Sequence, residues 1–165
     1  MFLNAFTLAH VVISLVGIGS GFVVVNGLIA AKRLDFWTAL FLLTTVLTSV
    51  TGFFFPADHF TPGHAIGILS LLALAVAILA RYGRHLAGAW RTTYVVSAVI
   101  SLYLNFFVLI VQTFDKVPAP KNLAPTQSEP PFLVAQVVAL ALFVALGVVA
   151  VIRFRAEAVQ QTAVV

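Results

Sequence analysis

Five long apolar stretches dominate this chain and constrain its fold more than any other feature. They cover about residues 4–31, 35–55, 64–82, 91–114 and 131–153. A helix of about 20 apolar residues crosses the hydrocarbon core of a bilayer, and the only alternative in lipid is a closed barrel. Barrel strands alternate in polarity, whereas these stretches are apolar on every face. The sequence therefore predicts an all-α integral membrane bundle of five transmembrane helices, forming a single transmembrane domain over residues 1–165.

The composition excludes several classes of soluble protein. Hydrophobic residues make up 62% of the chain, charged residues only 8%, and cysteine is absent. An ordinary soluble domain has roughly 25% charged residues. These values argue against a cytosolic enzyme, a disulfide-bonded secreted domain and a thiolate metal site. Phosphate-binding, nucleophile-elbow and zinc-protease motifs are also missing, so the sequence favours a non-enzymatic protein.

The basic residues indicate how the bundle is oriented. They are few and scattered, which does not suit nucleic acid, but they are unevenly divided between the two sides of the membrane. Cytoplasmic loops carry an excess of Lys and Arg, so an external amino terminus and an internal carboxyl terminus are predicted. The external side then holds only Lys116 and Lys121. The internal side holds seven basic residues: Lys32, Arg33, Arg81, Arg84, Arg91, Arg153 and Arg155.

The connections are short except for one proline-rich segment, residues 115–131. Its five prolines predict a stiff external loop without helix, serving either as a lid over the bundle or as a simple connector. At the third span, Thr61 is expected to cap the helix with Pro62 at its first position. Gly83 is expected to end that helix in a left-handed conformation.

Polar residues inside the spans are the first candidates for function, because they are costly in lipid. His10, Ser14, Gly17 and Gly21 lie on one face of the first helix at the helical repeat. The Gly17–Gly21 pair allows a close approach by another helix or by a flat ligand. The stripe is therefore either a packing seam, which is favoured, or a ligand-binding face.

Four polar side chains are expected at comparable depth on four different helices. They are His10, His64, Gln112 and Gln136. If these helices turn the four residues inward, they line one cavity that opens to the outer side and binds a small ligand or cofactor.

Three chemistries are open for this cavity. His10 and His64 could be the axial ligands of a b-type haem. Asp58, His59 and His64 could hold a divalent metal, although their spacing matches no standard zinc motif. A quinone or lipid pocket needs apolar walls with a few hydrogen-bonding groups, which the histidines and glutamines could supply beneath a rim of phenylalanines.

Three segments resemble a group of uncharacterised bacterial inner-membrane proteins. They are Thr51–Pro56 (TGFFFP), Pro62–His64 (PGH) and Ala124–Phe132 (APTQSEPPF). The resemblance covers most of the chain and implies a bacterial inner membrane, with the outer side periplasmic. It carries no activity, so no catalytic residue is transferred.

The sequence thus predicts a small polytopic membrane protein with a histidine-containing pocket near the periplasmic face. The alternatives are a membrane redox protein linked to b haem or quinone, and an accessory subunit that packs against a larger complex. The lipid bilayer is its expected partner, and whether it forms a homo-oligomer is open.

Overall fold

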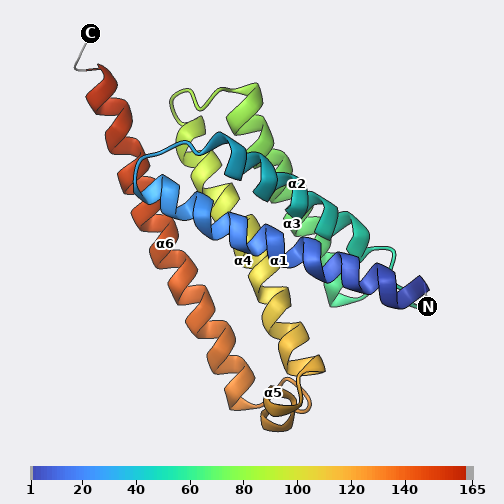
Figure 1. The fold of residues 1–165 in the computed structure, drawn as a ribbon. Helices are drawn as coiled ribbons and strands as arrows, with labels where there is room; N and C mark the ends of the chain where they lie inside the picture. Colours follow the sequence, from blue (N-terminus) through green and yellow to red (C-terminus); the bar gives the residue numbers. More distant parts are fainter. Residues whose placement is uncertain (1, 163–165) are drawn as a thin grey trace.

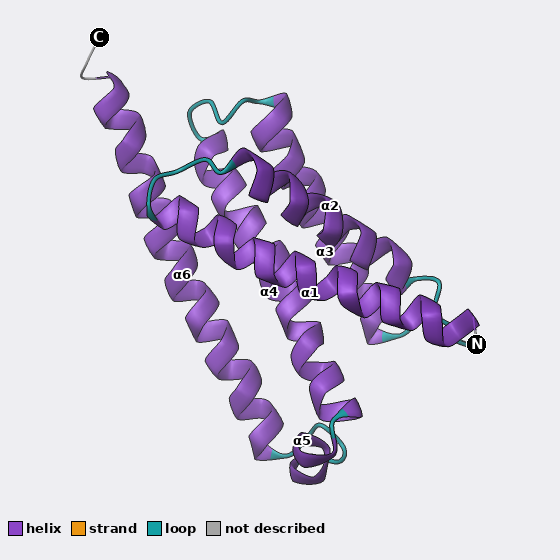
Figure 2. Cartoon of the chain, viewed as in Figure 1, coloured by secondary structure: helices purple, strands orange, loops and turns teal. Residues whose placement is uncertain are grey.

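The computed structural model describes residues 2–162, with side chains described for residues 4–155. The helices are α1 (Phe2–Ile29), α2 (Asp35–Gly52), α3 (Pro62–Ile78), the π-helical turn η1 (Leu79–Gly83), α4 (Trp90–Lys116), the short α5 (Pro118–Leu123) and α6 (Pro130–Thr162). Residues 2–162 contain no strand (Figure 2). Within the described residues, five helical segments are long and apolar enough to cross a membrane, with α3 and η1 counted as one. The all-α, five-helix prediction is confirmed.

The helices form a bundle that divides into two arms. α1 packs along α2, α3 packs against α4, and α4 packs against α6. Figure 1 shows α1, α2 and α3 running together toward the N-terminal end of α1, whereas α4 and α6 run in another direction and are joined through α5. We call these the α1–α3 arm and the α4–α6 arm. This division determines which predicted site residues can meet.

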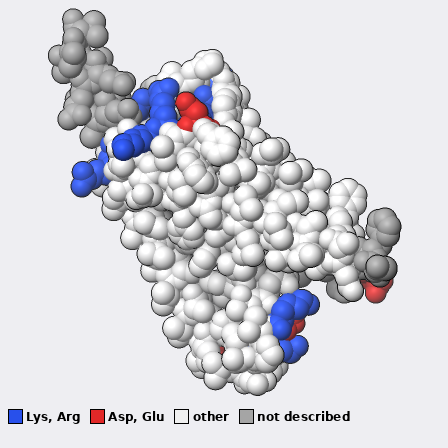
Figure 3. Space-filling model, in the orientation of Figure 1, with Lys and Arg blue, Asp and Glu red and all other residues white. Residues whose placement is uncertain are grey.

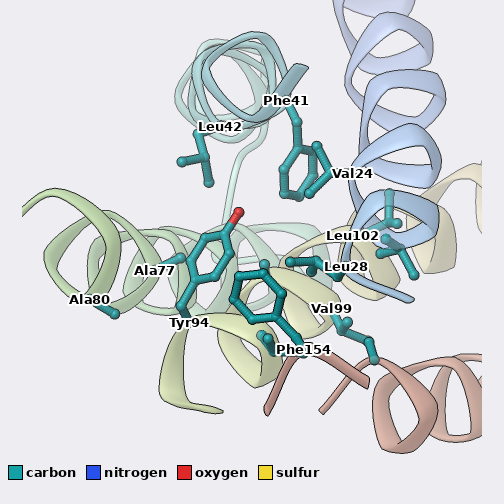
Figure 4. Close-up of a cluster of buried hydrophobic side chains, with 14 of the residues drawn as sticks. Val24, Leu28, Phe41, Leu42, Ala77, Ala80, Tyr94, Val99, Leu102 and Phe154 are labelled. Atoms are coloured by element: carbon teal, nitrogen blue, oxygen red, sulfur yellow. The ribbon is translucent and has the colours of Figure 1, made fainter. Parts of the chain in front are cut away.

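The core lies where the two arms join. Tyr94 of α4 is fully buried among Leu42 of α2, Ala77 of α3 and Phe154 of α6 (Figure 4). A large buried aromatic side chain of this kind stabilises a fold. Its neighbours on the surrounding helices must also pack closely around its shape. Val24 and Leu28 of α1 belong to the same cluster, so the core joins all five spans.

The stripe on α1 is a packing seam. Ser14 donates a hydrogen bond to Asn105 Oδ1 of α4 at 2.9 Å. A Cβ atom on Gly17 would lie 3.2 Å from polar atoms of Thr44, Thr45 and Asn105. One on Gly21 would lie 2.5 Å from Leu102 Cδ1 and 3.0 Å from the Phe41 ring. Because glycine has no side chain, Gly17 and Gly21 let α1 approach α2 and α4 closely. This agrees with the interpretation of the stripe as a packing seam.

The proline-rich loop differs from its prediction. We expected no helix in residues 115–131, but Pro118–Leu123 forms α5. The first N–H groups of a helix have no partner within it, so prolines at its start remove no hydrogen bond. Both Pro118 and Pro120 lie in the first turn of α5, where this tolerance applies.

Of the predictions for the two ends of the third span, one is confirmed and one is wrong. The cap at Thr61 is confirmed, and it is reinforced by His64, whose ring accepts from the Thr61 backbone N–H in a capping box. The prediction that Gly83 ends this helix in a left-handed conformation is wrong. The chain instead passes through the η1 turn and takes positive φ values at His85 and Leu86, because the wider π turn continues the helix through Gly83.

Figure 3 shows most of the basic side chains at one end of the molecule, with a smaller group elsewhere on the surface. We call the first the basic end. By their positions near the internal ends of the spans, its residues are Lys32, Arg33, Arg81, Arg84, Arg91, Arg153 and Arg155. Two of these residues are buried and bind neighbouring helices. Arg81 donates to the Arg33 carbonyl at 3.0 Å and forms an ion pair with Asp35. Arg91 donates to the Phe154 carbonyl at 3.1 Å. Part of the charge that sets the predicted orientation therefore also holds helix ends together.

Candidate ligand site at the end of the α1–α3 arm

His10 is held by the end of α2. Its Nδ1 lies 2.7 Å from Thr51 Oγ1. The Thr51 hydroxyl donates to the Leu47 carbonyl at 2.6 Å, so the Thr51 oxygen accepts from His10. Nδ1 therefore carries the proton, and Nε2 of the neutral ring presents a lone pair. No described residue hydrogen-bonds to Nε2.

His64 has the opposite arrangement. The backbone N–H of Thr61 donates to His64 Nδ1 at 3.0 Å. A backbone N–H can only donate, so Nδ1 is unprotonated and the neutral ring carries its proton on Nε2. His64 therefore offers a hydrogen-bond donor where His10 offers an acceptor.

Phenylalanines surround both imidazoles. Phe55 meets the His10 ring edge-on at 5.0 Å between centroids, and Phe6 lies 5.1 Å from Phe55. Phe53 stacks on His64 at 5.5 Å. Both Phe53 and Phe55 belong to the short connection between α2 and α3, so this connection brings the two histidines to the same end of the arm. We call this set the histidine end, comprising His10, Phe53, Phe55 and His64.

The two glutamines lie on the other arm. Gln136 is buried on α6 and donates to the Phe107 carbonyl of α4 at 3.4 Å, while its Oε1 is buried with no partner among the described residues. Gln112 of α4 is exposed. No hydrogen bond between described residues joins either glutamine to His10 or His64. The pocket predicted from all four residues thus stays a prediction, and the geometry groups the histidines alone.

The predicted metal site gains no support from the geometry. Asp58 and His59 are both exposed in the connection between α2 and α3. No three His, Asp or Glu side chains in the described part of the chain come close enough to hold a metal ion. His64 is also committed, since its Nδ1 lone pair caps α3.

The proline-rich loop is attached to the α4–α6 arm. Gln127 donates to the Val111 carbonyl of α4 at 3.0 Å. Glu129 accepts from the Thr126 hydroxyl at 2.8 Å and from the Thr126 backbone at 3.2 Å. Desolvation raises the pKa of the Glu129 carboxyl, but these hydrogen bonds outweigh it and the net pKa lies below that of a free glutamate. The loop is therefore ordered at the end of the opposite arm from the histidines.

Sequence reasoning missed the partners of the two histidines. Thr51 lies 41 residues from His10, and no local pattern indicates that they meet. The role of His64 had a detectable signal, because a Thr followed three residues later by a side-chain acceptor is the spacing of a capping box. That spacing marks His64 as a structural residue through Nδ1, with only Nε2 left for binding.

Comparison with known proteins identifies no relative. No family model, curated protein or solved structure matches this chain.

Proposed function

We propose that this protein binds a small lipid-soluble ring compound at the histidine end, and that a quinone is the ligand class that fits best. The proposal depends on one observation, the opposite hydrogen-bonding character of the two free Nε2 atoms. His64 can donate to a quinone carbonyl, and His10 can accept from the hydroxyl of the reduced form. The flanking phenylalanines supply apolar, stacking walls of the kind that bind flat rings.

The same observation argues against b-type haem as the ligand. An axial histidine needs a lone pair on the nitrogen that faces the iron. His10 offers one, but His64 would have to move its proton from Nε2 to Nδ1, which breaks the capping bond from Thr61. Haem ligation by this pair would therefore destabilise the start of α3.

We expect His10→Phe to weaken binding of decylubiquinol, the reduced form of decylubiquinone, by about tenfold. The substitution keeps a flat ring against Phe55 and removes the acceptor, and one hydrogen bond is worth up to about 1.5 kcal/mol. Isothermal titration of the detergent-purified protein measures the change. His59→Phe is the matched control, because His59 is exposed and lies outside the histidine end.

Equal affinity in His10→Phe and wild type would contradict the proposal. An absorption spectrum and an elemental analysis of the same sample address the other chemistries. A Soret band that sharpens on reduction would replace quinone by haem, and a stoichiometric metal would favour the Asp58–His59–His64 set.

We propose further that the protein lies in a bacterial inner membrane, with its amino terminus in the periplasm and its carboxyl terminus in the cytoplasm. The gathering of basic residues at one end supports this orientation, because Lys and Arg are retained on the cytoplasmic side (Figure 3). The histidine end would then face the periplasm.

Cysteine labelling tests the orientation, since the chain has no native cysteine. A membrane-impermeant maleimide is expected to label His59→Cys in intact cells and to label Lys32→Cys only after the cells are permeabilised. Both positions are exposed, so the two variants differ only in the side of the membrane on which they lie. The reverse pattern would invert the topology.

A further inference from the structure

Two apolar grooves lie side by side on the surface of α3, α4 and α6. One, of about 410 Å³, lies between α4 and α6. The other, of about 470 Å³, lies between α3 and α4. Both are bordered by Thr92, Val96 and Ile100 of α4, so these three residues form a ridge with a groove on each side.

The groove between α4 and α6 is built from a glycine and from exposed aliphatic side chains. Gly147 leaves its floor open, because a Cβ there would already touch Val99 at 3.4 Å. Val144, Val148 and Ile152 of α6 also line it, and each exposes more than half of its surface. Apolar side chains this exposed need an apolar partner.

The length of this groove matches one leaflet of a bilayer. Its lining on α6 extends from Leu140 to Ile152, about 18 Å at 1.5 Å per residue. Half of a hydrocarbon core is about 15 Å. An acyl chain of one leaflet therefore fits along it from end to end.

Positive charge continues the groove at the basic end. Arg155 lies seven residues after Val148 and eleven after Val144, so helix geometry places it within about 20° of their row on α6. Arg84 lies just before α4, with its guanidinium 5.2 Å from the centre of the Trp90 ring. Asp35 is the one acidic residue among the described side chains at this end, and Arg81 already pairs with it.

We propose that this surface binds an anionic phospholipid. The headgroup phosphate lies at Arg155 and Arg84, and the two acyl chains lie in the two grooves on either side of the ridge formed by Thr92, Val96 and Ile100. The paired grooves specify a two-chain lipid, and the arginines specify a negative headgroup, since each basic residue near the membrane surface attracts anionic lipid.

Retention of lipid through purification tests the proposal. The protein is reconstituted in vesicles of equal parts phosphatidylglycerol and phosphatidylcholine, extracted in mild detergent, and its bound lipid is measured by mass spectrometry. We expect enrichment of phosphatidylglycerol, with about fivefold less retained by Arg155→Gln. Lys121→Gln is the control, because it removes one exposed charge at the opposite end and is expected to change nothing.

The grooves are tested by filling one of them. Gly147→Leu is expected to reduce retention of both lipids, whereas Gly19→Leu is expected to have no effect, because a Cβ on Gly19 meets nothing within 4 Å. Val148→Trp provides a second filling variant at an exposed position, should the leucine disturb folding. Size-exclusion chromatography checks that each variant remains folded.

Three results would overturn the proposal. The first is equal retention of the two lipids by the wild type. The second is retention that neither Gly147→Leu nor Val148→Trp changes. The third is a lipid-free dimer that dissociates on Gly147→Leu, which would assign the grooves to a second copy of the chain.

Discussion

Gly21→Val is expected to destabilise the bundle by about 3 kcal/mol, the upper part of the range for overpacking a tight core. The first added carbon would lie 2.5 Å from Leu102 Cδ1 and 3.0 Å from the Phe41 ring. Leu102 meets the added carbon with the end of its side chain, but it is 0% exposed and has little room to turn away. Phe41 is only 1% exposed, so its ring has little room, and α1 must separate from α2 or α4.

Gly19→Val separates this steric effect from helix propensity. Gly19 lies on the same helix two residues away, and a Cβ there meets nothing within 4 Å. The same substitution therefore changes propensity without a clash, and we expect a change below about 1 kcal/mol. Unfolding by a denaturing detergent, followed by circular dichroism, measures both variants. Equal destabilisation would show that the α1 seam is not tightly packed.

Asp35→Ala is expected to destabilise the protein by about 2 kcal/mol. The Arg81 side chain is only 5% exposed, whereas Asp35 is 87% exposed. Removing the carboxylate leaves a buried guanidinium without its counter-charge, which is the costly way to break a buried ion pair. We expect less than the full penalty because Arg81 keeps its hydrogen bond to the Arg33 carbonyl and because Asp35 itself lies in solvent.

A double-mutant cycle identifies the source of this loss. Adding Arg81→Met to Asp35→Ala is expected to recover much of the lost free energy of unfolding, because the buried, unpaired guanidinium is then removed. Asp115→Ala is the control for losing an exposed ion pair. Its partner Lys116 is 71% exposed, so a change of at most about 0.5 kcal/mol is expected. No recovery in the double variant would mean that Arg81 acts through packing alone.

The helices were largely predictable from local sequence, and the reasons are local as well. Each apolar stretch must satisfy its own backbone in lipid, and a helix does so without help from the rest of the chain. The cap at Thr61 is local for the same reason. The errors fall at α5 and η1, where proline and glycine patterns were expected to exclude a helix or end one, and the backbone tolerated a helical turn at each.

The candidate site was only partly predictable. Counting residues from the ends of the predicted spans placed His10, His64, Gln112 and Gln136 at comparable depth in the membrane. Depth along a helix does not say which helices are neighbours. His10 meets Thr51, and Gln136 meets the Phe107 carbonyl, each on its own arm. The hydrogen-bonding character of each imidazole follows from these contacts, so it could not be obtained before the packing was known.

The sequence by itself determined an all-α chain with five segments able to span a membrane, because hydrophobicity and backbone hydrogen bonding act within each segment. It also placed the basic residues at the ends of those segments. Only the tertiary structure decided that the α1 stripe is a seam against α2 and α4, and that α4 and α6 run in another direction from the α1–α3 arm (Figure 1). The physical reason is that helix packing depends on small and large side chains fitting across several helices at once, a property that no single segment contains.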